Sequence, residues 1–249
     1  MYQNNRNNNF AIVIPAYNEE ATIRDVVKAA LDQCEKVIVV DDGSADKTIE
    51  KIEGLPVTLI KHETNKGKAA ALWSGFMSAM EQGVDAIITI DGDGQHAADD
   101  VQLLLAKAEK FPQDIIIGAR LTDKSAIPAK RYYANKFANF WIAWAAGYPI
   151  ADSQSGFRLY PKALFDGLDI SIEHGFVFES EILIKAAQRG IYSHPVKIPA
   201  VYKKGARPSH FRGVQDIVLI TKMVGKSLYT RWFFLSGLYH SLTDSNKNY

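Results

Sequence analysis

The stretch that decides the fold reads Ala86-Ile87-Ile88-Thr89-Ile90-Asp91-Gly92-Asp93-Gly94. Its apolar, β-branched first half predicts a buried strand, and the turn that follows places Asp91 and Asp93 at the strand's carboxyl end, where open α/β sheets bind ligands. Carboxylates at positions i and i+2 of an irregular turn can both reach a hard cation such as Mg²⁺ or Mn²⁺, and that cation keeps positions open for substrate phosphates. A surface turn rich in Asp and Gly is the alternative interpretation.

Strand and helix patterns alternate on both sides of this stretch. We predict further strands over residues 10–14, 36–40, 57–60 and 115–118. Helices are predicted over residues 19–33, 46–52, 68–82 and 99–110. This alternation predicts an α/β fold, a mostly parallel sheet with helices on both faces.

The alternation becomes less regular after Arg120. Helices are predicted over residues 130–146, 179–189 and 214–235, short strands over 156–160 and 196–198, and a loop over 205–213. The chain shows neither an internal repeat nor a low-complexity linker, so we expect the second half to be woven into the same domain.

The composition excludes several classes of protein. With 47% hydrophobic and 23% charged residues, the 249-residue chain is expected to be globular. A formal net charge of +1 excludes a general electrostatic attraction to nucleic acid, so no nucleic-acid partner is expected. The single cysteine, Cys34, excludes an internal disulfide and fits a reducing, cytoplasmic compartment. Residues 1–9 are Asn-rich and lack the apolar core of a secretory signal, so we expect a disordered tail there.

A second predicted strand also ends in acidic residues, Asp41-Asp42-Gly43-Ser44. Adjacent carboxylates at that position can bond the base and the ribose hydroxyls of a nucleotide, whereas in the alternative interpretation Ser44 or Asp46 only caps the next helix. Acidic ends on two strands of one parallel sheet favour a nucleotide cleft.

Two further segments suit the same cleft. The first strand ends in Pro15-Ala16-Tyr17-Asn18-Glu19, whose ring, amide and carboxylate could flank a nucleobase and ribose, although Asn18 also suits a helix N-cap. Asn65-Lys66-Gly67-Lys68 precedes a helix, where backbone N–H groups and lysines suit phosphate. That segment is not a P-loop, and the Asp91 turn is not an EF-hand, because both lack residues that those motifs require.

Together, in this order and spacing, these motifs resemble those of the inverting glycosyltransferases of family 2. The resemblance implies the GT-A fold, a Rossmann-like architecture of nucleotide-diphospho-sugar transferases. Within that family the chain is most similar to the dolichyl- and polyprenyl-phosphate sugar synthases. The further matches are Gly118-Ala119-Arg120, Asp152 with Ser155-Gly156-Phe157-Arg158, and Phe178-Glu179-Ser180-Glu181-Ile182.

The resemblance implies a role for each matching residue. The donor is expected to be bound by Pro15, Tyr17, Asn18, Glu19, Asp41, Asp42, Lys68, Asp91, Gly92, Asp93 and Arg120. The divalent cation, Mg²⁺ or Mn²⁺, is expected on Asp91, Asp93 and Gln95, and the acceptor on Ser155, Arg158, Arg207 and Ser209. Catalytic roles are expected for Asp91, Asp93, Arg120 and Glu179.

The expected chemistry follows from charge. Breaking the bond between the anomeric carbon and phosphate leaves a nucleoside diphosphate with an additional negative charge, which a bound cation and nearby Lys or Arg side chains stabilise. A lipid-phosphate acceptor is already anionic and requires no strong general base. A hydroxyl acceptor requires one, for which Glu179, Glu181 and Asp152 are candidates, unless both glutamates only stabilise a helix N-terminus.

The resemblance therefore implies a metal-dependent hexosyltransferase, similar to the dolichyl- and polyprenyl-phosphate mannosyltransferases. Its expected donor is of the GDP-mannose or UDP-glucose type, and its expected acceptor is a lipid, polyprenyl phosphate. One alternative is a family 2 enzyme that glycosylates a hydroxyl in glycolipid or polysaccharide assembly. Another is a catalytically silent nucleotide-sugar-binding subunit at a membrane. The basic loop 202–212 carries His210 where those synthases carry lysine, and no acid precedes Arg207, which leaves the acceptor open.

The C-terminal part suits a membrane surface. The predicted helix 214–235 has an apolar stripe with Lys222, Lys226 and Arg231 among it, and Trp232-Phe233-Phe234 at its end, as interfacial helices do. The earlier helix contributes aromatic residues of the same kind, Tyr132, Tyr133, Trp141 and Trp144. A core-packing helix or a homodimer interface is the alternative. We expect a peripheral protein on the inner face of the cell membrane.

These expectations divide the chain into parts. After the tail of residues 1–9 we expect a GT-A glycosyltransferase domain over 10–212. Its nucleotide-sugar-binding half covers 10–120 and its acceptor half 121–212. Residues 213–249 are expected to form an amphipathic C-terminal helical extension.

Overall fold

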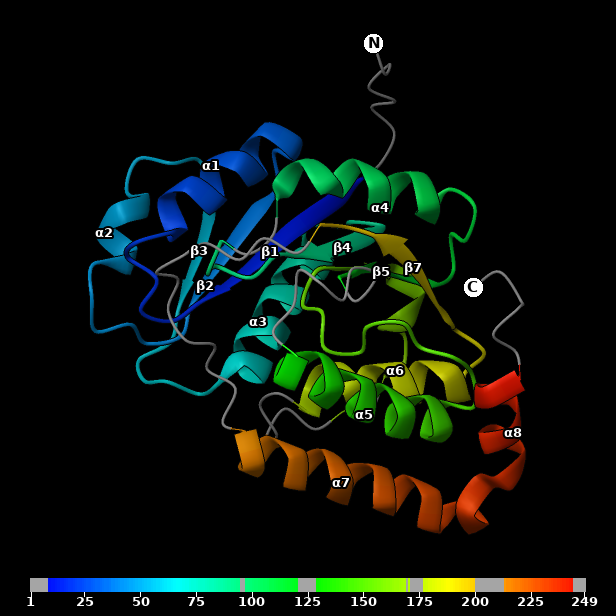
Figure 1. The fold of residues 1–249 in the computed structure, drawn as a ribbon. Helices are drawn as coiled ribbons and strands as arrows, with labels where there is room; N and C mark the ends of the chain where they lie inside the picture. The colour runs from blue at the N-terminus through cyan, green and yellow to red at the C-terminus, as the bar shows by residue number, and fades with distance from the viewer. Residues whose placement is uncertain are drawn as a thin grey trace.

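The computed structural model of the chain describes residues 9–94, 97–120, 129–168, 170, 177–199 and 213–243, and only the backbone of 129–131 and 213–218. The strands are β1 (Phe10–Ala16), β2 (Val37–Asp41), β3 (Thr58–Lys61), β4 (Ala86–Thr89), β5 (Ile115–Ala119), β6 (Arg158–Pro161) and β7 (Ser193–Lys197). They form one 7-stranded sheet in the order β3-β2-β1-β4-β6-β5-β7 (Figure 1).

The sheet is mostly parallel, as predicted. In the middle of the parallel part, Val13 of β1 is aligned with Ile38 of β2 on one side and with Thr89 of β4 on the other. Strand β6 runs antiparallel to both its neighbours, β4 and β5. The carboxyl ends of β1, β2 and β4 therefore meet at one edge of the sheet, where the acidic turns begin.

Helices cover both faces of the sheet (Figure 1). One face carries α1 (Ile23–Gln33), α2 (Thr48–Ile52), η1 (Ala98–Asp100) and α4 (Val101–Ala108). The other carries α3 (Lys68–Glu81), α5 (Ala129–Ala146) and α6 (Phe178–Gln188), and the short turn η3 (Lys162–Leu164) follows β6. Because successive strand residues point to opposite faces, Ile12 packs under the first group and Val13 under the second. Each fully buried aliphatic side chain of this kind contributes roughly 1.5–3 kcal/mol.

The C-terminal part departs from the prediction. A single helix over 214–235 is wrong, because α7 (Gly213–Thr230) ends at Thr230 and is followed by the turn η5 (Trp232–Phe234) and by α8 (Leu235–Thr243). Helix α7 packs against the core on the face of the sheet that carries α3, α5 and α6. Its contact is an i, i+4 stripe made of Ile220, Val224 and Leu228. It forms a further layer outside α5 and α6 (Figure 1). None of the helices in the described part of the chain is long and apolar enough to cross a membrane.

The physical reason for the break lies in the turn η5. Trp232, Phe233 and Phe234 all have left-handed backbone, with φ of 52°, 60° and 37°, which costs an L-residue roughly 1–2 kcal/mol each. Contacts outside the turn stabilise it. A Cβ added to Gly147 would lie 2.8 Å from Cε1 of Phe234, so the missing side chain of this glycine makes room for the ring.

Candidate active site

The loops after β1 and β2 are tied together by Asn18. Its backbone has φ of 55°, a left-handed conformation that Asn tolerates, and its Oδ1 accepts a hydrogen bond from Ala45 N at 2.7 Å. Asn18 N donates to Ser44 Oγ at 2.8 Å. Asp46 Oδ1 accepts from Thr48 N at 2.9 Å, but the N-cap residue of α2 is Lys47, so the alternative in which Ser44 or Asp46 caps this helix is wrong. Asn18 therefore positions the two strand-end loops against each other.

Asp42 anchors the loop that precedes α3. The carboxylate is buried, and its Oδ1 lies 2.7 Å from His62 Nδ1 and accepts from Lys66 N at 2.9 Å. Its Oδ2 accepts from Gly67 N at 2.8 Å. His62 in turn lies 3.0 Å from Ser74 Oγ through Nε2. The sequence analysis assigned His62 no functional role, and no sequence pattern around it predicts its contact with Asp42.

Asp41 lies beside Asp42 but has spare hydrogen-bonding capacity. The residue is 2% exposed and its Oδ2 accepts from Ser44 N at 3.2 Å. Its Oδ1 is buried and finds no hydrogen-bond partner among the described residues. Such an atom costs about 1–3 kcal/mol unless a donor reaches it. Asp41 is therefore the carboxylate of this pair that is equipped to receive an N–H or O–H group from a ligand.

The turn after β4 brings Asp91 to a lysine from α3. Lys68 Nζ lies 2.7 Å from Asp91 Oδ1 and 3.1 Å from Glu179 Oε2, at the start of α6. Burial lowers the pKa of Lys68, but the negative charges of Asp91 and Glu179 outweigh it and raise that pKa above its usual value. The lysine is therefore protonated and joins two carboxylates that are far apart in the sequence. Glu179 Oε1 is buried without a hydrogen-bond partner among the described residues.

Glycines make room for this cluster. A Cβ added to Gly156 would lie 2.8 Å from Asp91 Oδ1, so only glycine fits where the chain enters β6. Gly92 O accepts from Thr22 Oγ1 at 2.7 Å, and Thr22 Oγ1 lies 3.4 Å from Glu19 Oε2. The Asp91 turn is thereby joined to the loop after β1.

The donor set at this turn fits a hard divalent cation. Asp91 and Asp93 are half-buried carboxylates of one turn, and carboxylate oxygens are the ligands that such a cation prefers. The contact between Asp91 and the ammonium group of Lys68 shows that positive charge is stabilised at this position. The described residues hold no cluster of three or more His, Cys, Asp or Glu side chains around one point. The predicted third ligand, Gln95, lies outside the described residues, as do the predicted acceptor residues Arg207 and Ser209.

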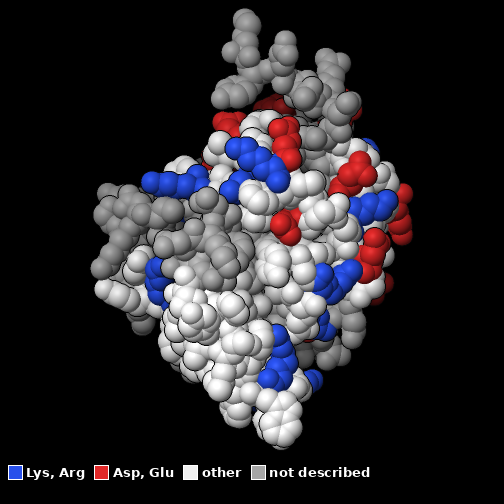
Figure 2. Space-filling model, turned by 90° about the vertical axis from the view of Figure 1, so that its right-hand side faces the viewer, with Lys and Arg blue, Asp and Glu red and all other residues white. Residues whose placement is uncertain are grey.

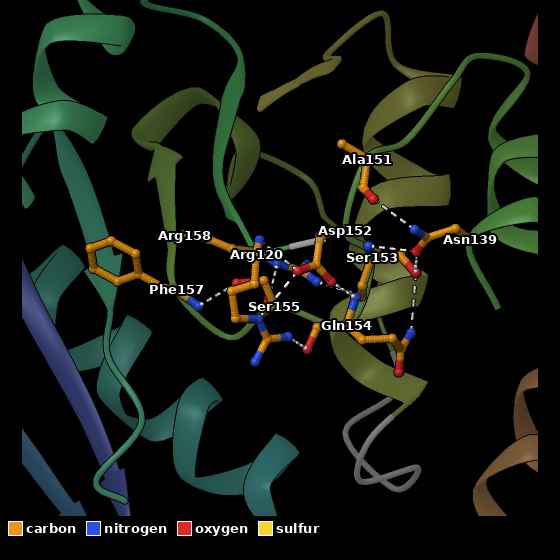
Figure 3. Close-up of polar contacts among 9 residues, drawn as sticks. All are labelled: Arg120, Asn139, Ala151, Asp152, Ser153, Gln154, Ser155, Phe157 and Arg158. Carbon is orange, nitrogen blue, oxygen red and sulfur yellow. Dashed lines mark hydrogen bonds and ion pairs between the residues drawn. The ribbon is translucent and has the colours of Figure 1, made fainter. Parts of the chain in front are cut away.

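Arg120 is held by the segment that leads to β6 (Figure 3). It is 8% exposed, and both its backbone N and its Nε donate to Asp152 Oδ2, at 3.1 and 3.2 Å. One terminal nitrogen donates to Gln154 O at 3.0 Å. Asp152, a candidate general base, is fully buried and thus serves as the partner of this guanidinium. Asn139 of α5, which sequence reasoning missed, accepts from Ser153 N at 2.8 Å and fixes the same segment.

Arg158 and Ser155, the described residues predicted to bind the acceptor, are both fully buried. The guanidinium of Arg158 donates to three backbone carbonyls, those of Ser155, Ser153 and Glu179, at 2.7, 2.8 and 2.7 Å. These bonds join the start of β6, the turn before it and the start of α6. The acceptor role of both residues stays a prediction, and this geometry favours an indirect one, in which they position Glu179 and the 153–155 backbone.

Comparison with known proteins identifies a family. The sequence model of glycosyl transferase family 2 matches residues 11–178. The chain is 30% identical over 213 residues to a UDP-N-acetylglucosamine–dolichyl-phosphate N-acetylglucosaminyltransferase of Methanococcus voltae, a match that covers 77% of this chain and 85% of that protein. It is 28% identical over 204 residues to the polyprenol monophosphomannose synthase of Mycolicibacterium smegmatis, which covers 77% and 76% of the two chains.

A solved structure shares the fold. Glucosyl-3-phosphoglycerate synthase from Mycobacterium tuberculosis, determined with Mn²⁺, UDP-glucose and phosphoglyceric acid, superimposes with a TM-score of 0.67 and 18% identity. The match covers 91% of this chain and 80% of that one. At this identity the likeness concerns the fold alone, and it confirms the GT-A architecture expected from the motifs.

Proposed function

This chain belongs to glycosyl transferase family 2, and we propose that it moves a sugar from a nucleoside-diphosphate donor to polyprenyl phosphate, with inversion at the anomeric carbon and with a divalent cation bound. The observation that carries the proposal is the cluster of Asp91, Lys68 and Glu179 at the carboxyl end of β4. It lies next to the strand-end loops that suit a nucleotide, so positive and negative groups meet where a diphosphate would lie.

The donor side is supported by the loops after β1, β2 and β3. Asp41 offers a buried carboxylate oxygen to a donor group of the nucleoside, and Pro15, Tyr17 and Glu19 line the same edge of the sheet. Asp42 supports this pocket indirectly, because its oxygens hold the loop before α3. The N-terminus of α3 and Lys68 face the diphosphate in this arrangement.

The leaving group is stabilised by charge in this proposal. Asp91 and Asp93, with Gln95, would hold Mg²⁺ or Mn²⁺, which supplies positive charge to the departing diphosphate. Lys68 and Arg120 add fixed positive charge on the protein side. A protein of the same fold, the glucosyl-3-phosphoglycerate synthase, was solved with Mn²⁺ and UDP-glucose, so this fold can hold a divalent cation together with a nucleotide-sugar.

A lipid phosphate is the acceptor that we favour. The names of the relatives, a dolichyl-phosphate N-acetylglucosaminyltransferase and a polyprenol monophosphomannose synthase, support this acceptor class and make N-acetylglucosamine and mannose the first sugars to test. A phosphate oxygen is anionic at neutral pH, so no base is required. The second candidate acceptor is a hydroxyl group. It is favoured by Oε1 of Glu179, which is buried without a hydrogen-bond partner among the described residues and could accept the proton of that hydroxyl.

A transfer assay tests the proposal. Purified protein with Mn²⁺ is offered UDP-N-acetylglucosamine, GDP-mannose and UDP-glucose, each with polyprenyl phosphate or with unphosphorylated polyprenol. We expect transfer to the phosphate alone, inversion at the anomeric carbon, loss on chelation, and at least roughly 100-fold slower transfer in Asp91→Asn. The matched control is Asp25→Asn, an exposed aspartate of α1, which should keep wild-type activity. Transfer to polyprenol alone would establish the second candidate, and an unaffected Asp91→Asn enzyme would exclude the metal role.

A further inference from the structure

We propose that the face formed by α5, the turn η5 and α8 docks on the surface of an anionic lipid bilayer, with Trp232 and Phe233 as its deepest point. This docking face consists of exposed apolar side chains on these elements and on the end of α7, among them Phe137, Phe140, Tyr229, Trp232, Phe233 and Leu235. The proposal rests on the proposed function in one respect only, which is that a lipid acceptor would reach the active site from this side.

Two half-buried tryptophans of α5, Trp141 and Trp144, connect the exposed rings of Phe137 and Phe140 to the turn η5. The rings of Phe137 and Trp141 lie 6.0 Å apart, those of Phe140 and Trp141 5.4 Å, and those of Trp141 and Trp144 5.4 Å. Trp144 Nε1 then donates to Phe233 O at 3.2 Å, which joins α5 to the turn. Exposed apolar side chains that gather on neighbouring elements are typical of an interaction site.

The turn η5 is built to present its first two side chains to the outside. Phe234 packs inward against Gly147, and the guanidinium carbon of Arg231 lies 3.4 Å from the centre of its ring. Arg231 also donates to Ala145 O at 2.7 Å. Trp232 and Phe233, by contrast, are 92% and 60% exposed. The strained backbone is thus anchored by Phe234 and Arg231, while the rings of Trp232 and Phe233 remain largely exposed to solvent.

The charges around the docking face favour an anionic membrane as its binding partner. Residues 129–151 and 219–243 contain no Asp or Glu, and their basic side chains include Lys136, Lys222 and Lys226, all exposed. Figure 2, which views the side of the molecule where α8 lies, shows basic and uncharged side chains in the lowest part and acidic ones higher up. A symmetric dimer through this face would set one basic surface against another. An anionic bilayer offers both an apolar interior and the opposite charge.

A small pocket lies beside the docking face. It lies between α5 and α7, and its lining includes Phe137, Trp141, Gln154 and Ile220. Gln154 O is the acceptor of the Arg120 guanidinium. Docking through this face would therefore place the membrane beside a residue, Gln154, that contacts Arg120 of the candidate active site.

Vesicle sedimentation tests the docking face. The full chain is mixed with vesicles of phosphatidylcholine alone or with added phosphatidylglycerol. We expect co-sedimentation with the anionic vesicles only, weakened by salt, and at least roughly tenfold weaker binding for the double variant Trp232→Ser with Phe233→Ser. Leu103→Ser is the matched control, an exposed apolar residue of α4 on the opposite face of the sheet, and should bind as wild type.

Further variants separate this inference from the proposed function. Lys222→Glu with Lys226→Glu should lose anionic-vesicle binding while the aromatic turn is intact, and Asp91→Asn should bind vesicles as wild type. Wild-type binding by the Trp232 and Phe233 double variant would overturn the inference, as would a self-association in solution that this variant abolishes. Transfer to detergent-dispersed polyprenyl phosphate reports on the proposed function alone and should survive in the double variant.

Discussion

Lys68 Nζ lies 2.7 Å from Asp91 Oδ1, so the carboxylate proposed to bind a divalent cation already carries a cationic partner from α3. The same lysine contacts Glu179, and the negative charges of both acids keep it protonated. A metal ion that approaches Asp91 must therefore compete with Lys68, or bind while the lysine turns towards the donor diphosphate. Metal binding and donor binding are coupled through one side chain in this arrangement.

Replacing Lys68 should separate the two events. In Lys68→Met we expect several-fold tighter binding of Mn²⁺ to the donor-free protein, because Asp91 loses its competitor, together with weaker donor binding and slower transfer. Titration of free Mn²⁺ by electron paramagnetic resonance measures the first effect without any turnover. Lys61→Met, which removes an exposed lysine of β3, should leave Mn²⁺ binding unchanged. Weaker Mn²⁺ binding in Lys68→Met would show that the lysine supports the metal site instead of competing with it.

Gly156 should be as important to Asp91 as Lys68 is. A Cβ at this position would lie 2.8 Å from Asp91 Oδ1, so Gly156→Ala must displace the carboxylate. We expect lower Mn²⁺ affinity and at least roughly tenfold slower transfer, with the fold retained. Gly225→Ala in α7 is the control, because an added Cβ there meets nothing within 4 Å and should stabilise the helix by roughly 0.5–1 kcal/mol. Normal metal affinity in Gly156→Ala would mean that Asp91 moves without consequence.

Local patterns in the sequence were sufficient for most of the fold. The apolar, β-branched runs that end at Ala16, Asp41 and Thr89 place three strands within a few residues of their observed bounds. The acidic residues after them lie at one edge of the sheet because parallel neighbours end together. Strand β7 was expected over 196–198 but begins at Ser193 and includes Pro195, which a sheet tolerates because β7 is an edge strand.

Non-local contacts were beyond the reach of sequence patterns. The three aromatic residues 232–234 fit a helix as well as a turn, and the slot that favours the turn is provided by Gly147, far away in the sequence. The same holds for the candidate site. Arg158 was expected from its motif to bind the acceptor. Its burial could not be foreseen, because the three carbonyl groups that it contacts come together only once β6 and α6 have packed. Lys68 was expected to face phosphate, and its contact with Asp91 depends on the packing of α3 over β1 and β2, next to β4.

Gly43 should be required by the loop that Asp42 anchors. It has φ of +73° and a Cβ added there would lie 2.7 Å from the carbonyl carbon of Thr64, whereas Gly54 has φ of +76° and nothing within 4 Å. Both changes to Ala carry the cost of left-handed backbone, about 1–2 kcal/mol, and Gly43→Ala adds a clash. We expect Gly43→Ala to lower the free energy of unfolding by clearly more than Gly54→Ala in urea denaturation, and also to weaken donor binding. Equal losses of unfolding free energy in the two variants would show that the backbone at Thr64 shifts to accommodate the added Cβ at no cost.

The buried hydroxyl of Tyr160 should make the fold sensitive to alkali. Burial, opposed by the charge of Arg158, raises the pKa of Tyr160 to about 12. An unfolded chain loses this proton near the ordinary value of about 10. Between these two values the folded state binds the proton that the unfolded state has released, so the free energy of unfolding falls as pH rises.

Tyr160→Phe tests this alkaline loss. Because the variant has no proton to release, its free energy of unfolding should fall less steeply above pH 10, by up to about 1.4 kcal/mol for each pH unit, and should differ little from wild type near neutrality. Urea denaturation at a series of pH values gives the two curves. Tyr133→Phe, which removes an exposed hydroxyl, is the matched control. Parallel curves for Tyr160→Phe and wild type would mean that the alkaline sensitivity arises elsewhere in the chain.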